Sequence, residues 1–112
     1  MIEQVILEYM KKAIDVPVHM ERPENPPEMY VLLEKTGSGY EDGIYSAVFI
    51  FQSYADTLYE AAALNELLKQ AIEHMPETED EICRCQLNSD YNYTDTAEKK
   101  YRYQAVYDIT HY

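Results

Sequence analysis

The alternation of apolar and polar side chains in residues 44–75 predicts a strand that runs through a short polar turn into a helix. Apolar side chains are nearly continuous over residues 47–51, which is typical of a strand covered by helices on one face and partly covered on the other. A T-x-x-E capping box at residues 57–60 starts the helix, and Pro76 is expected to end it after residue 75. The core stripe of this helix is expected to comprise Ala61, Leu64, Leu68, Ala71, Ile72 and Met75.

The elements on either side of this unit follow from the same periodicities. Residues 2–14 carry apolar side chains at helical spacing and predict an amphipathic helix, which Pro17 prevents from continuing. Four further strands are expected: a short, proline-marked edge strand over residues 16–20 and longer strands over residues 29–35, 82–87 and 101–110.

Two segments between the predicted strands are expected to reach outward. Residues 36–43 contain all three glycines of the chain and predict a flexible hairpin loop between strands. In residues 88–100, the alternation of Tyr91 and Tyr93 predicts a strand that extends outward as a long hairpin arm, with its turn near residues 95–99. These segments are the expected working parts, because they project from the core.

Length and the mixture of elements predict one α+β domain. The 112 residues fit a single domain over residues 1–112, and a chain of this size can bury a core without disulfides. No apolar run approaches the roughly 20 residues that span a bilayer. Charged side chains interrupt the apolar stripe of residues 1–20, so neither a membrane span nor a secretory signal is expected.

The charge balance narrows the possible partners. Nine Lys and Arg residues stand against 21 Asp and Glu residues, which gives a net charge of −12. Affinity for nucleic acids comes mostly from basic side chains that neutralise phosphates, and anionic membranes attract basic segments. Tight nucleic-acid binding and membrane binding are therefore not expected. The twelve tyrosines, of which half follow residue 90, suit protein interfaces instead.

The residues that could carry chemistry are scattered. Cys83 and Cys85 are too close for a good disulfide and too few for a structural zinc site, so we interpret them as small core side chains in a reducing setting. Residues 90–94 imitate the start of a calcium loop but lack its glycine and its bidentate glutamate. The three histidines follow no metal-site spacing. The sequence therefore predicts a protein that is not an enzyme and uses no cofactor or metal.

Four stretches together resemble a known family: residues 30–37 (YVLLEKTG), 51–62 (FQSYADTLYEAA), 87–95 (LNSDYNYTD) and 101–109 (YRYQAVYDI). In this order they are similar to the tail terminator, or tail-to-head joining (tail completion), proteins of siphophages and prophages of Gram-positive bacteria. The resemblance covers the chain from about residue 30 to its end. No single motif within it is diagnostic.

The resemblance implies a mixed or antiparallel sheet of about four to five strands with two helices packed on one face. It further implies a homo-oligomeric ring, as a hexamer, at the head-proximal end of the tail tube. This ring would stop tail polymerisation and contact both the tail tube protein and the head connector. Such a protein would be assembled in the host cytoplasm and reside in the tail or neck of the virion. Genomic DNA would pass through the lumen without tight binding, and a net charge of −12 is compatible with that passage.

The interface of such a ring is expected on the two projecting segments. The candidate residues combine glycines, tyrosines and charged side chains: Gly37, Tyr40, Asp42, Asp90, Tyr91, Tyr93, Asp95, Lys99, Lys100 and Tyr101. The tyrosines among them could equally form ordinary cross-strand pairs within a hairpin, and both roles are compatible.

Two other functions remain open at this point. A head-closure or neck adaptor protein would share the same composition and the same neighbours in the virion. An acidic inhibitor that mimics DNA would also carry a strong negative charge. Mimicry requires carboxylates spaced along one face like phosphates, whereas the acids here cluster in residues 21–28, 41–42 and 77–81, which disfavours it.

Overall fold

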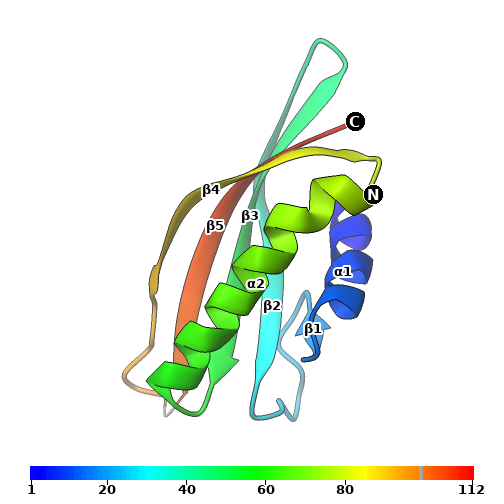
Figure 1. The fold of residues 1–112 in the computed structure, drawn as a ribbon. Coiled ribbons are helices and arrows are strands. Elements are labelled where there is room, and N and C mark those ends of the chain that lie inside the picture. Colours follow the sequence, from blue (N-terminus) through cyan, green and yellow to red (C-terminus); the bar gives the residue numbers. More distant parts are fainter. Residues whose placement is uncertain (99) are drawn as a thin grey trace.

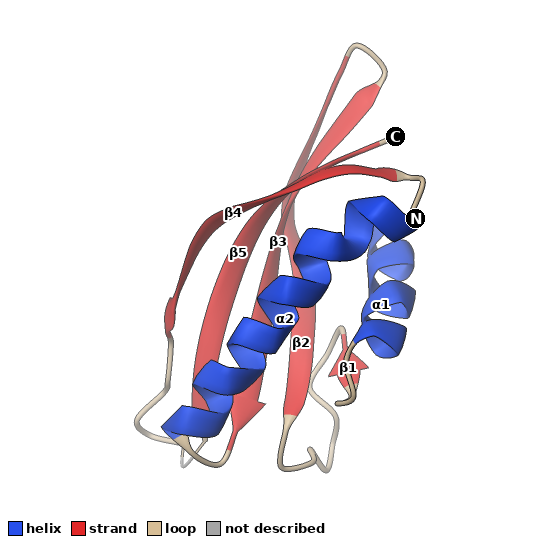
Figure 2. Ribbon diagram, viewed as in Figure 1, coloured by secondary structure: helices blue, strands red, loops and turns tan. Residues whose placement is uncertain are grey.

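The chain folds into one sheet with two helices against one of its faces, as Figures 1 and 2 show. The structure, a computed structural model, describes residues 1–98 and 100–112. These residues form two helices and five strands: α1 (Ile2–Ala13), β1 (Val18–His19), β2 (Tyr30–Glu41), β3 (Ile44–Ala55), α2 (Leu58–Thr78), β4 (Ile82–Asn92) and β5 (Tyr101–His111). The predicted α+β fold with its helices packed against a sheet is confirmed.

The strand order of the sheet is β1-β2-β3-β5-β4. The pairing of β1 with β2 is parallel, and the other three pairings are antiparallel, so the sheet is mixed. The short β1 lies at one edge, as its proline-marked sequence predicts. β3 and β5 pair along their whole lengths, from Tyr45 opposite His111 to Ala55 opposite Tyr101, and form the centre of the sheet.

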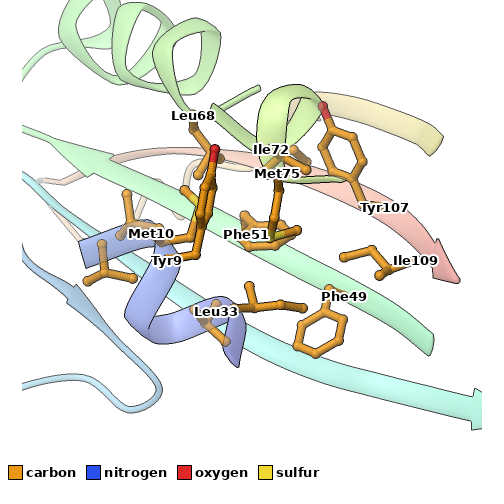
Figure 3. Packing of buried hydrophobic residues seen from close by; sticks show 14 of the residues in the cluster. Tyr9, Met10, Leu33, Phe49, Phe51, Leu68, Ile72, Met75, Tyr107 and Ile109 are labelled. Atoms are coloured by element: carbon orange, nitrogen blue, oxygen red, sulfur yellow. The ribbon is translucent and has the colours of Figure 1, made fainter. Parts of the chain in front are cut away.

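The hydrophobic core lies between the helices and one face of the sheet. Figure 3 shows side chains of both helices meeting side chains of β2, β3 and β5. In α2 the buried residues are Ala61, Leu64, Asn65, Leu68, Ile72 and Met75, so the predicted stripe is confirmed apart from the half-buried Ala71. Each large apolar side chain buried here contributes about 1.5–3 kcal/mol. The helices also bond to each other, because the Tyr9 hydroxyl donates to the Ala71 carbonyl at 2.6 Å.

The ends of α2 show one prediction confirmed and one that is wrong. The Glu60 N–H donates to Thr57 Oγ1 at 3.1 Å, so Thr57 caps the helix as expected. Pro76, however, does not end the helix, which continues to Thr78. A proline in the last turn removes a single N–H, and the backbone still closes because the Glu79 N–H donates to the Met75 carbonyl at 2.9 Å.

The β2–β3 hairpin extends far beyond the helices (Figure 1). The outward hairpin predicted over residues 36–43 is confirmed, but most of it is strand rather than loop, since β2 continues to Glu41 and a turn of two residues, Asp42 and Gly43, leads into β3. Both turn residues have positive φ, 53° and 82°, as two-residue hairpin turns with matching twist require. Pairing with β3 overrides the weak strand propensity of the glycines, and a bulge between Lys35 and Gly37 absorbs the misfit.

In the segment predicted as an outward arm, residues 88–100, the continued strand and the turn are confirmed, with the turn at residues 96–98, but the outward projection is wrong. β4 continues to Asn92. The connection that follows contacts the loop before β2, since Lys100 Nζ donates a hydrogen bond to the Glu28 carbonyl at 2.6 Å. The projecting β2–β3 hairpin instead makes the molecule elongated, with extents of 45 × 24 × 24 Å. Neither helix in the described residues is long and apolar enough to cross a bilayer.

Candidate assembly surfaces

The structure separates the predicted interface residues into two groups at opposite ends of the sheet (Figure 1). One group, Gly37, Tyr40 and Asp42, lies on residues 37–46, which we call the hairpin tip. The other group lies where β4 meets β5, and we call residues 90–102 the base: Asp90, Tyr91, Tyr93, Asp95, Lys100 and Tyr101. The separation arises because β3 runs from the tip to the base and β5 returns. Lys99, also predicted, lies outside the described residues.

The hairpin tip presents aromatic and aliphatic side chains to solvent. Tyr40 is 63% exposed, Tyr45 is 45% exposed and Ile44 is 42% exposed. The rings of Tyr40 and Tyr45 lie 4.6 Å apart across the hairpin, and Tyr45 stacks on His111 of β5 at 5.3 Å. These contacts tie the root of the tip to the sheet, so its exposed side chains sit on an ordered backbone.

Glycine makes the tip hollow on one side. Two adjoining hollows of about 590 and 420 Å³ border the tip, and Gly39 lines both. A Cβ at Gly39 would lie 3.0 Å from Ser46 Oγ, whereas a Cβ at Gly37 would meet nothing within 4 Å. Ser46 and Thr110 line both hollows together with Gly39.

At the base, Asp90 is turned inward rather than toward a partner. Its Oδ2 accepts from Lys69 Nζ at 2.7 Å and from Asn65 Nδ2 at 2.9 Å, both on α2. The hydrogen bond from Lys69, followed by that from Asn65, holds the pKa of the Asp90 carboxyl below its usual range despite partial burial. Asp90 thus fastens β4 to α2, a role that its position in a tyrosine-rich segment does not reveal.

The face of the sheet opposite the helices carries a connected row of polar side chains. We call it the open face, because no helix of the described residues covers it (Figure 2). Gln104 Nε2 donates to the Tyr91 hydroxyl at 2.7 Å, and Gln52 Nε2 donates to Gln104 Oε1 at 2.8 Å. The Tyr54 hydroxyl then donates to Gln52 Oε1 at 3.3 Å. The row joins β4, β5 and β3, so it fixes the side chains of the open face in one arrangement.

Arg102 ends this row between two tyrosine rings. Its guanidinium carbon lies 4.5 Å from the ring centroid of Tyr93 and 5.5 Å from that of Tyr54. Its Nη1 donates to the Tyr54 hydroxyl at 2.9 Å and its Nε to the Tyr93 carbonyl at 2.8 Å. Tyr54 in turn stacks on the fully buried Tyr30, with the ring centroids 4.6 Å apart and the rings nearly parallel. The guanidinium is therefore held in position by the fold.

Lys100 connects the base to the turn before α2 and to the loop before β2. Its Nζ lies 2.7 Å from the Asp56 carboxylate, next to the start of α2, and 2.6 Å from the Glu28 carbonyl. The backbones of Asp95 and Lys100 form an isolated antiparallel β-bridge, and the Asp95 carboxylate accepts a hydrogen bond from the Ala97 N–H at 2.9 Å. Asp95 is exposed, as are the three predicted tyrosines of the base: Tyr91, Tyr93 and Tyr101 are 41%, 49% and 40% exposed.

The residues that organise the open face were not among the predicted site residues. They are Gln52, Tyr54, Arg102 and Gln104. Alternation places Gln52 with Tyr54, and Arg102 with Gln104, on one face of their own strands. Their meeting depends on the register that sets Gln52 opposite Gln104, and residue patterns alone do not supply that register.

The described residues contain no group of three or more His, Cys, Asp or Glu side chains placed to hold a metal ion. Cys85 packs against the hydrophobic core, as its interpretation as a core side chain predicts, and burial raises the pKa of its thiol to about 12. Cys83 is half-buried at the start of β4.

Comparison with known proteins identifies no relative of this chain. No protein-family model matches the chain, and no curated protein matches it significantly.

Proposed function

We propose that this protein is a structural component of a siphophage tail. It forms a ring at the head-proximal end of the tail tube, ends tail polymerisation and joins the tail to the head connector. Six copies form the ring, as the resemblance of residues 30–112 to tail terminator proteins implies. The protein acts through its surfaces, and the proposal assigns it no reaction.

The observation that carries the proposal is the pair of different exposed surfaces at the ends of an elongated domain. The hairpin tip exposes Tyr40, Ile44 and Tyr45, and the base exposes Tyr91, Tyr93 and Tyr101. A ring requires that one patch of each subunit meets a different patch of the next. Tyrosines suit both patches, because they bury a large area while losing little side-chain entropy.

The charge supports the same proposal. A ring that surrounds passing DNA needs a lining that does not bind phosphates, and the excess of carboxylates supplies this over much of the surface. The helix α2 alone exposes Glu66, Glu73 and Glu77. Like-charged subunits also repel each other outside specific contacts, which disfavours random aggregation.

The test is a tail-assembly reaction with the tail tube protein encoded beside this chain. Tube protein is polymerised with and without the chain, and tube lengths are measured by negative-stain electron microscopy. We expect tubes that stop growing, each with a ring at one end, and a ring mass of six chains by native mass spectrometry. Tubes that elongate unchanged, without bound chain, would contradict the proposal.

The same experiment separates the tail terminator from the neck adaptor. Purified head connector is offered in a parallel reaction without tube protein. A neck adaptor binds the connector and leaves tube length unchanged, whereas the proposed terminator caps tubes before it binds the connector. Capture of a host DNA-binding enzyme without either effect would favour the acidic inhibitor instead.

A further inference from the structure

The geometry points to a specific contact between copies: the carboxylates of the hairpin tip, Glu41 and Asp42, bind the Arg102 guanidinium of a second copy. This inference rests on the proposed repeated assembly of copies and deepens it by naming the contact. The ring subunits would then meet tip to base.

Arg102 has the features of a carboxylate receptor. Two ring contacts and two hydrogen bonds hold its guanidinium in place, so little side-chain entropy remains to be lost on binding. A guanidinium has five N–H donors, and the described contacts use only Nε and Nη1. A carboxylate is the acceptor that matches the remaining planar edge.

Arg102 also lacks a carboxylate partner among the described residues. Within the described residues, Arg22, Lys35, Lys69 and Lys100 each lie within 3.3 Å of an Asp or Glu oxygen. Arg102 forms no such pair with any described carboxylate, although the chain holds 21 acids against nine bases. An ordered, half-buried arginine without a counter-ion is unusual in so acidic a protein.

The hairpin tip supplies the complementary charge. Glu41 and Asp42 are adjacent and exposed, and neither forms an ion pair within the described residues. The nearest lysine along β2, Lys35, is already paired with Glu3 of α1 at 3.3 Å. Two neighbouring carboxylates without a cation repel each other, and a guanidinium between them relieves this repulsion.

The tip that binds Arg102 belongs to a second copy and not to the same chain. The tip and Arg102 lie at opposite ends of a molecule 45 Å long, so no bending of the hairpin brings them together. The contact joins different patches of two subunits, which is the heterologous geometry that a ring needs. It also brings Ile44, which pairs with Glu41 in the hairpin, to Tyr93, whose ring contacts Arg102.

A charge-swap cycle tests the contact. Sedimentation velocity measures self-association of the full chain at low and high salt for the wild type, Glu41→Lys, Arg102→Glu and the double variant. We expect each single variant to weaken association by about tenfold or more, and the double variant to recover most of it. Because salt also screens the repulsion between like-charged copies, each salt series is compared with that of Arg102→Glu, and rising salt should narrow the difference in association between the wild type and this variant.

Matched controls separate contact from folding. Arg84→Glu makes the same charge change at an exposed arginine on β4 and should leave association unchanged. Glu41→Lys lies in the exposed hairpin, so its effect does not depend on the internal contacts of Arg102; circular dichroism confirms folding of each variant. Asp42→Asn serves as the second tip variant, because asparagine tolerates the φ of 53°.

The outcomes distinguish this inference from the proposed function. If Arg102→Glu and Glu41→Lys cap tubes as well as the wild-type chain does, the contact is overturned and the proposed function stands. Salt-sensitive association that obeys the charge swap, without any capping of tubes, would support the contact and overturn the function. A chain that stays monomeric at high concentration, at low and at high salt alike, overturns the contact.

Discussion

At the scale of single residues, the polar groups beneath α2 differ in whether they find a partner. Asp90 and Lys69 are fully paired between β4 and α2. The Tyr107 hydroxyl and the Asn65 Oδ1 are buried, and neither bonds to any described residue. Burial raises the pKa of the Tyr107 hydroxyl, as expected for a phenol held away from water. Substitutions of neighbouring side chains in this layer are thus expected to change the free energy of unfolding in opposite directions.

Removing the Tyr107 hydroxyl should be neutral or stabilising. Tyr107→Phe deletes a buried donor without a described partner, so we expect the free energy of unfolding to stay the same or rise by about 1–2 kcal/mol. Tyr9→Phe is the matched control, because it deletes a hydroxyl that donates to Ala71 at 2.6 Å, and it should lower stability by about 1 kcal/mol. Urea denaturation measures both, and an equal loss in the two variants would contradict this assignment.

Asp90 should make the stability of the protein sensitive to acid. Because its folded pKa lies below the ordinary value of 3.8, the ion pair stabilises the fold above that pH, and the stabilisation is lost as pH falls through the lowered folded value. Asp90→Asn should lower the free energy of unfolding by about 1–3 kcal/mol at neutral pH and flatten its decline below pH 4.

The control for Asp90 uses the other acid on the same lysine. Glu66 contacts Lys69 at 2.8 Å, but its side chain is 66% exposed. Glu66→Gln should therefore change stability by less than about 1 kcal/mol. Denaturation curves between pH 2 and pH 7 make the comparison; a larger effect of Glu66→Gln than of Asp90→Asn would show that the buried pair is not the acid-sensitive contact.

At the scale of elements, the helices and the last strand were predictable from sequence, whereas the length of β2 was not; β5 matches its predicted range of 101–110 to within one residue. α1 and α2 match their predicted ranges to within three residues, since helical periodicity and the Thr57 cap are local signals. β2 is six residues longer at its end than the predicted strand, because Gly37 and Gly39 read as loop residues on their own. They become strand residues only through pairing with Val48 and Ser46, which no local pattern reports.

The turn of the hairpin should depend on one glycine and not on another. Gly43 has a φ of 82°, which side chains with a Cβ rarely adopt, so Gly43→Ala should lower the free energy of unfolding by about 1 kcal/mol. Gly37→Ala is the control: a Cβ there meets nothing within 4 Å, and the loss of chain freedom in the unfolded state should raise stability by up to about 1 kcal/mol. Thermal unfolding distinguishes them, and a Gly37→Ala variant that is the less stable of the two would refute the turn geometry.

At the scale of the whole molecule, the sequence predicted one of the two projecting segments correctly and misplaced the other. The tyrosines of residues 91–101 were predicted on a projecting arm, yet they lie at the base, and the projecting segment is the hairpin that carries Tyr40 and Asp42. The strand order β3-β5-β4 decides this arrangement, and it depends on long-range pairing. No local pattern singles out Arg102, because its partners come from β3 and from the connection that follows β4.

Shortening the hairpin should abolish assembly and spare the fold. Deleting the facing pairs Gly39–Ser46 and Tyr40–Tyr45 removes two residues from each strand, so the remaining side chains keep their faces. We expect a folded monomer whose unfolding free energy changes by less than about 2 kcal/mol, because the deleted residues are exposed. Native mass spectrometry and circular dichroism check this.

The contrasting deletion lies at the base. Removing residues 90–98 also removes the Asp90 contacts to Asn65 and Lys69 on α2, so we expect that variant to lose its fold. A shortened hairpin that still assembles, or a base deletion that remains folded and associates normally, would contradict the roles given to the two ends.

The two-residue turn and the continuous ladder of the β2–β3 hairpin have a consequence for binding kinetics. A docking element that is already ordered loses little conformational freedom on contact, so its affinity is not reduced by a folding step. Substitutions of Tyr40 or Ile44 should then leave the association rate nearly constant and act on the dissociation rate. The lifetime of the assembly would then depend on the side chains of the hairpin tip.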